Sequence, residues 1–196
     1  MIYPIVAYGD PVLKKEAEEV PEGYSDLKKL VDDMFETMHN ASGVGLAAPQ
    51  IGKSLRLFVI DLSPFAEDPE LEKEEREQLE GLQKAFINPE MVEETGKKWA
   101  FSEGCLSIPN INEDIFREPE IVINYLDTDF NEHEERFTSL AARVIQHEFD
   151  HIEGVLFTDK ISSFKKRLIN NKLKHISQGK VKVDYRMRFP KIKKGR

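Results

Sequence analysis

Residues 147–151 read His-Glu-x-x-His, the pattern in this chain with the clearest chemical meaning. On a helix, side chains four residues apart lie on one face, so His147 and His151 would point the same way. Two imidazoles arranged like this can occupy two positions around a metal ion, and Glu148 can reach a metal-bound water. The alternative is a pair of ordinary core histidines, because so short a pattern also arises by chance.

A catalytic metal site of this kind needs a third protein ligand and keeps one open position. Downstream, Phe157 stands where one group of metalloproteases has a third histidine, and no glutamate follows Glu153. Upstream, the only cysteine is Cys105, and a thiolate is a strong ligand for a borderline-soft metal. Cys105 is therefore the better candidate, although a lone cysteine is more commonly a small buried hydrophobic residue.

The two histidines need a helix to hold them, and the flanking residues predict one. Thr138 and Ser139 are suitable N-cap residues, and good helix formers follow them. Leu140 and Val144 fall on the same stripe as the histidines, and Gly154 follows the last turn, where glycine is favoured.

The remaining chain predicts a mixture of helices and strands. Periodic apolar residues indicate helices over 25–39 and 163–176 and strands over 55–62, 85–88, 121–126, 134–137 and 181–189. Pro89, Gly96, Pro109 and Pro119 are expected to separate elements, and His133 is expected in a hairpin turn. The glutamate-rich residues 63–84 are expected to form an acidic surface insertion with a turn or two of helix and without chemistry.

Length and composition favour one soluble catalytic domain over residues 1–189, followed by a basic tail over 190–196. The single cysteine excludes an internal disulfide and suits a reducing compartment. The N-terminus has no secretory signal pattern, and no apolar run is long enough to span a membrane, so we expect a cytoplasmic protein.

The net charge of −8 is unevenly distributed along the chain. Half of the 28 Lys and Arg residues lie in 160–196, where Asp184 is the only acidic residue. This asymmetry favours contact between the basic end and a polyanion, with a solvated helix face and frayed tail as the alternative.

Three segments contain the candidate chemical residues together with small residues: Gly43-Val-Gly-Leu-Ala-Ala-Pro-Gln50, Glu103-Gly-Cys-Leu-Ser107 and Gln146-His-Glu-Phe-Asp-His151. In this order they closely resemble the three motifs of peptide deformylases, and Gly9-Asp10-Pro11-Val12-Leu13 is similar to that family too. The resemblance implies an α+β fold: antiparallel sheets around a central metal-binding helix, with a C-terminal helix and strand. It also implies hydrolysis of the N-formyl group from the starting methionine of new polypeptides, releasing formate.

The resemblance implies a role for each matching residue. Cys105, His147 and His151 match the metal ligands, and Glu148 matches the catalytic carboxylate that acts as general base and acid. The oxyanion donors would be Gln50 and the backbone N–H of Leu106. The peptide backbone would lie as an added strand near Val44, Gly45 and Gly104.

The ligand set suits iron, zinc, nickel or cobalt, and the resemblance favours Fe²⁺ in the cell, with Zn²⁺ or Ni²⁺ possible. The expected partners are formyl-methionyl nascent peptides and the ribosome, contacted through residues 160–196; neither a membrane nor DNA is expected. Two other classes stay open: a metalloprotease using the same water and glutamate, and a ribosome-associated binding module with a structural metal.

Overall fold

A five-stranded sheet is the largest sheet of the protein, seen in a computed structural model that describes residues 1–190. The strand order is β2-β3-β4-β7-β8, and all neighbours are antiparallel. Branched and aromatic residues at every second position bury one face of β7, as a half-buried strand requires. The strands are β2 (Gly45–Ala47), β3 (Leu57–Asp61), β4 (Gln83–Thr95), β7 (Glu120–Leu126) and β8 (Glu132–Thr138).

A second sheet consists of β5 (Trp99–Cys105) and β6 (Ile108–Arg117), which pair antiparallel and were not predicted. Gly96 makes the preceding turn with a φ of +94°, and this confirms its predicted place between elements. The prediction was wrong for two prolines, since Pro89 lies inside β4 and Pro109 inside β6. The register of β4 against β7 shifts next to Pro89, and such a bulge tolerates a missing N–H donor.

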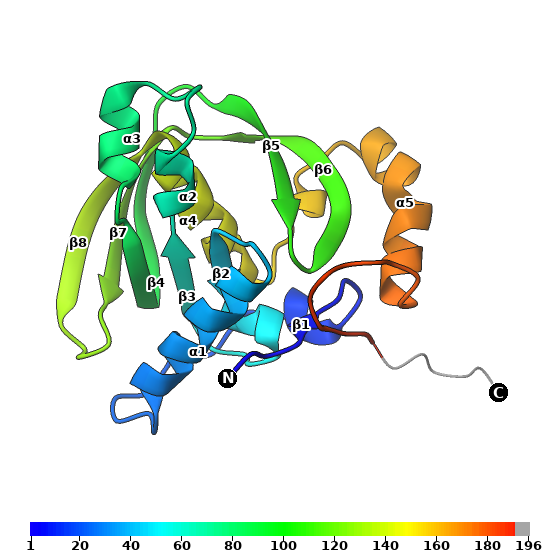
Figure 1. Cartoon of the computed structure of the whole chain (residues 1–196), viewed down its shortest axis with the longest axis horizontal. Helices are drawn as coiled ribbons and strands as arrows, with labels where there is room; N and C mark the ends of the chain where they lie inside the picture. The colour runs from blue at the N-terminus through cyan, green and yellow to red at the C-terminus, as the bar shows by residue number, and fades with distance from the viewer. Residues whose placement is uncertain (191–196) are drawn as a thin grey trace.

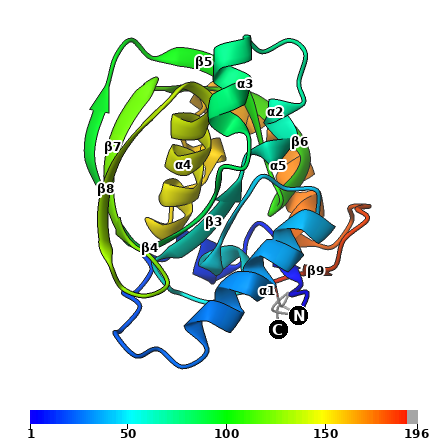
Figure 2. The same cartoon turned by 60° about the vertical axis from the view of Figure 1, so that its left-hand side comes forward.

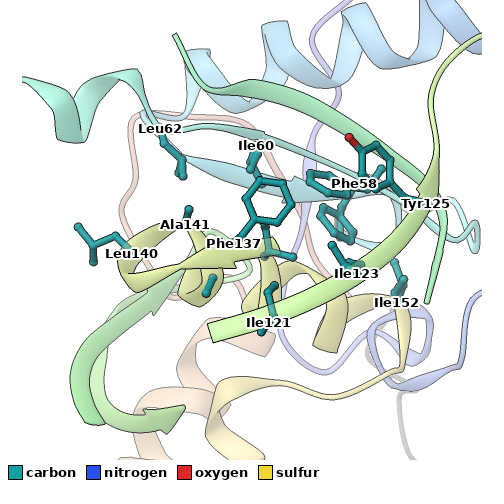
Figure 3. Close-up of a cluster of buried hydrophobic side chains, with 14 of the residues drawn as sticks. Phe58, Ile60, Leu62, Ile121, Ile123, Tyr125, Phe137, Leu140, Ala141 and Ile152 are labelled. Atoms are coloured by element: carbon teal, nitrogen blue, oxygen red, sulfur yellow. The ribbon is translucent and has the colours of Figure 1, made fainter. Parts of the chain in front are cut away.

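Helix α4 (Ser139–Ile152) lies within the curve of the large sheet, as Figure 2 shows. Its apolar face packs against residues of β3, β4, β7 and β8, and Figure 3 shows these side chains meeting. The predicted α+β class, with antiparallel sheets around a central helix, is confirmed. The remaining helices are α1 (Leu27–Asn40), α2 (Ser63–Ala66), α3 (Lys73–Leu79) and α5 (Ser163–Ser177), with 3-10 turns at Pro11–Lys14, Ala48–Ile51 and Phe157–Asp159.

Segments near the two ends of the described residues, β1 (Ile5–Val6) and the red stretch after α5, form a small parallel pair (Figure 1). Strand β1 pairs with β9 (Met187–Arg188). The predicted strand over 181–189 was therefore too long, because only its last part finds a backbone partner. The predicted tail lies outside the described residues from residue 191 onward.

One further expectation was wrong, since His133 lies in β8, stacked on Tyr125, and not in the hairpin turn. The insertion 63–84 contains the expected short helical turns, α2 and α3. Leu79 is buried there, and Phe65 lines the main cleft. Over residues 1–190, no helix combines the length and the apolar character needed to cross a membrane.

Candidate active site

The structure brings the three predicted metal ligands together. His147 and His151 occupy successive turns of α4, with ring centroids 5.1 Å apart. Cys105 ends β5, and its Sγ lies 3.3 Å from Nε2 of His151. The ligand atoms of all three residues lie within 4.8 Å of one another. One thiolate and two imidazoles match the donor set of a catalytic site with three protein ligands.

Glu103 supports this centre through a hydrogen bond with His147. It is buried, and it accepts a 3.0 Å hydrogen bond from Nδ1 of His147, which leaves Nε2 as the free ring nitrogen. Arg117 donates to it twice, at 2.7 and 2.9 Å, and Arg143 donates once, at 2.7 Å. Burial alone would raise the pKa of Glu103, but hydrogen bonds from His147 and Arg117 hold this pKa well below the usual range of a glutamate.

The sequence analysis missed this supporting cluster. Arg117 also pairs with Asp150 at 2.7 Å, and the guanidinium of Arg143 lies 4.2 Å from the ring centroid of Trp99. The two arginines are balanced by the carboxylates of Glu103 and Asp150, and a low-dielectric interior requires such compensation. The sequence did carry a signal for this cluster. Arg143 lies one turn before His147, on the same face of α4 as the apolar residues Leu140 and Val144.

Glu148 lies beside the three predicted ligands and is buried. Within the described residues, its Oε2 has no hydrogen-bond partner. A buried oxygen without a partner is costly, so this atom is suited to meet a water or substrate group. Burial raises the pKa of Glu148 to about 7, against the opposing charges of His147 and Arg117. A carboxyl group with this pKa can both accept and donate a proton near neutrality.

Gln50 reaches the centre from the 3-10 turn Ala48–Ile51. Its Oε1 accepts a 2.8 Å hydrogen bond from the N–H of Ala47, and this turns its amino group inward. Nε2 lies 3.5 Å from Sγ of Cys105 and 3.4 Å from Oγ of Ser107. Leu106 follows Cys105 directly and lines the same cleft. The two predicted oxyanion donors therefore flank the predicted ligands.

The third group of predicted residues lines a cleft of about 570 Å³. Val44 and Gly45 lie on the side of β2, which is the edge of the large sheet, and Gly104 lies near the end of β5. A Cβ atom added to Gly45 would overlap Oε1 of Glu148, so a larger residue at this position would displace that carboxylate. The cleft thus has a strand edge, a buried carboxylate and the cluster of Cys105, His147 and His151 side by side. Its apolar lining includes Phe65, Phe101, Leu140 and Val144.

Comparison with known proteins is consistent over the whole chain. The model of the family described as "Polypeptide deformylase" matches residues 2–167. Peptide deformylases of Christiangramia forsetii and Flavobacterium johnsoniae are 59% and 55% identical to this chain. Each alignment covers 100% of this chain and 100% of the relative.

Solved structures agree with the sequence relatives. A peptide deformylase from Legionella pneumophila is 36% identical with a TM-score of 0.77, covering 92% of this chain and 98% of its own. One from Thermotoga maritima is 41% identical with a TM-score of 0.71, covering 83% and 99%. The fold, the sequence likeness and the meeting of the three motifs lead to one assignment: this chain belongs to the peptide deformylases, enzymes that remove the N-formyl group from nascent peptides.

Proposed function

We propose how this chain's residues perform the deformylase reaction, with residues 1–189 acting as one catalytic domain. One observation carries the proposal: Cys105, His147 and His151 converge within 4.8 Å beside the unpartnered carboxylate oxygen of Glu148. These three side chains would hold a divalent metal ion. When bound, such an ion supplies Lewis acidity, which polarises a carbonyl and makes a water more acidic.

Glu148 is the proposed general base and acid. Its carboxylate takes a proton from the water that attacks the formyl carbon, and the same proton then passes to the amine nitrogen as the C–N bond breaks. The products are formate and a peptide with a free N-terminal amine. A buried position helps this transfer, because bulk water does not compete for the proton.

Gln50 and the N–H of Leu106 are the proposed oxyanion donors. Negative charge develops on the formyl oxygen as the water attacks, and fixed donors stabilise that charge most when they are in place beforehand. The hydrogen bond from Ala47 to Oε1 holds the Gln50 amide, so that its amino group faces the cleft.

Val44, Gly45 and Gly104 are the proposed peptide-binding residues. Strand β2 pairs with β3 alone in the sheet of residues 1–190, and its other edge borders the cleft. An extended peptide can pair with such an edge through its backbone, which explains how one enzyme would accept many sequences. The apolar side chains in the cleft lining suit the side chain of methionine.

The first test is formate release. The protein, loaded with ferrous iron without oxygen, is expected to release formate from formyl-Met-Ala-Ser and to leave the internal peptide bonds intact. Cleavage of those bonds without formate release would favour a metalloprotease. Tight metal binding with neither activity would favour a non-enzymatic binding module.

Replacing Gln50 by leucine should lower turnover about a hundredfold, because one oxyanion donor is lost. Metal content should be unchanged, since Gln50 is not among the proposed ligands. Steady-state kinetics and elemental analysis measure the two quantities, and Gln178→Leu, at an exposed position beyond α5, serves as the matched control. Near-normal turnover in Gln50→Leu would contradict the assigned role.

Ferrous iron is the proposed metal in the cell. A thiolate beside Fe²⁺ is sensitive to oxygen, since the sulfur can be oxidised in steps to acids that no longer ligate. Activity is therefore expected to decline in air and to persist under nitrogen, measured as formate release over time. A zinc-loaded sample is the control, and equal loss in both samples, or in neither, would argue against iron.

The basic end, residues 160–196, is proposed to contact ribosomal RNA, which would place the enzyme in the cytoplasm. Arg167 and Lys172 are exposed on α5 and have no ion pair among the described residues. Arg167→Glu/Lys172→Glu should reduce co-sedimentation with ribosomes, and binding of the unmodified protein should weaken steeply with salt. The double variant Lys73→Glu/Lys97→Glu is the control, and unchanged sedimentation of the α5 variant would refute the contact.

A further inference from the structure

The segment that follows α5 forms part of the wall of the active-site cleft. Residues Lys182–Tyr185 line the cleft together with Asn110 of β6. This segment is not a strand, and side chains hold it in place of a backbone ladder. The hydroxyl of Tyr185 donates to the carbonyl oxygen of Leu106 at 2.8 Å, and Nδ2 of Asn110 donates to the carbonyl oxygen of Lys182 at 3.4 Å.

The loop that carries Leu106 is held by both ends of the chain. Next to the bond from Tyr185, the N–H of Tyr8 donates to the carbonyl oxygen of Ser107 at 2.9 Å. The two end segments are themselves linked, because the N–H of Ala7 donates to the carbonyl oxygen of Arg188 at 2.9 Å. Two consecutive carbonyl groups of the loop are therefore fixed by groups that are remote in sequence and paired in space.

The side chain of Leu106 is confined as well. A Cβ added to Gly43 would lie 2.9 Å from Cδ1 of Leu106, so the leucine packs directly against the segment leading into β2. Tyr185 is half-buried, and burial raises its pKa to about 12. Its hydroxyl therefore stays protonated at neutral pH and can donate the hydrogen bond to Leu106. Leu106 is thus restrained at its side chain by Gly43 and at its carbonyl by Tyr185.

We infer that Tyr185 is a positioning residue for deformylation, holding the Leu106 loop so that its N–H is in place for the oxyanion. This inference rests on the proposed role of Leu106. An oxyanion donor contributes fully only when it is preorganised, and a loop freed of one anchor samples other positions. Part of the roughly hundredfold contribution of such a donor should then be lost. The C-terminal segment therefore belongs to the catalytic apparatus of this chain.

The test is Tyr185→Phe, which removes one hydroxyl and keeps the ring. We expect kcat for formyl-Met-Ala-Ser to fall about tenfold, with KM changed by less than about twofold, since the lost contribution is made in the transition state. Hydrogen exchange of the Tyr8 amide, which donates to the Ser107 carbonyl of the same loop, should accelerate by about tenfold when followed by NMR, because the loop opens more readily. The exchange measurement does not depend on activity.

Tyr24→Phe is the matched control, since Tyr24 is also half-buried, lies outside the cleft lining and has no hydroxyl bond among residues 1–190. It should leave kcat and Tyr8 exchange unchanged. The inference is overturned if Tyr185→Phe keeps a normal kcat, or loses kcat and thermal stability without faster exchange at Tyr8. If the unmodified protein releases no formate, the proposed function fails instead, and the exchange result still decides whether Tyr185 restrains the loop.

Discussion

Cys105→Ser is expected to abolish stable metal binding and with it formate release. The substitution changes one atom, but a serine hydroxyl stays protonated near neutrality and is a poor ligand for a soft or borderline ion. Two imidazoles alone would remain. Since removing a mere supporting hydrogen bond weakens metal affinity about ten- to a hundredfold, loss of a direct ligand should weaken it more than about a hundredfold.

The measurement is metal content after dialysis, by elemental analysis, together with formate release. His39→Ala is the control, because His39 lies at the end of α1, pairs with Asp61 and stands outside the cluster of three. It should retain full metal content. If Cys105→Ser also retained its metal, the thiolate would not be a ligand, and the proposed centre would need a different third residue.

Glu148→Ala is expected to behave in the opposite way, keeping the metal and losing turnover. A positioned acid–base group contributes about a hundred- to ten-thousandfold, and Glu148 is assigned both proton transfers, so we expect a loss of at least about a thousandfold. Metal content should stay near that of the unmodified protein, because the ligand cluster does not include Glu148. The two variants together separate ligand from acid–base group.

Glu74→Ala, on the exposed face of α3, is the control for removing a glutamate. Kinetics with formyl-Met-Ala-Ser and elemental analysis should be run on the same preparations. Loss of metal in Glu148→Ala would show that this carboxylate supports the metal. Turnover within about tenfold of normal would mean that another group moves the proton.

Local pattern was a good guide to the helices and to most of the large sheet. The stripe through Leu140, Val144 and the two histidines predicted α4 because helical periodicity is a property of neighbouring residues. Strand β7 was predicted at nearly its full length for the same reason, since its inward residues alternate.

Local pattern failed where a strand lacks a buried face or a partner. Most of β5 is exposed, so its sequence shows no alternation between apolar and polar residues. The reverse holds for 181–189, where the sequence alternates but only residues 186–188 find backbone partners, in the segment that contains β1. A strand needs a neighbour to accept its hydrogen bonds, and the sequence of the strand alone does not state whether one is present.

The sequence by itself determined the chemistry available to this protein: two imidazoles one helical turn apart, one thiol, one glutamate beside them, and motifs that together indicated the family. These features depend on residue identity and short spacing, which the chain carries directly. The tertiary structure alone decided that Cys105 reaches His151, that Glu103 and two arginines form the buried support, and that Tyr185 anchors Leu106. Such contacts join residues far apart in the chain, so they exist only after the sheets and α4 have packed.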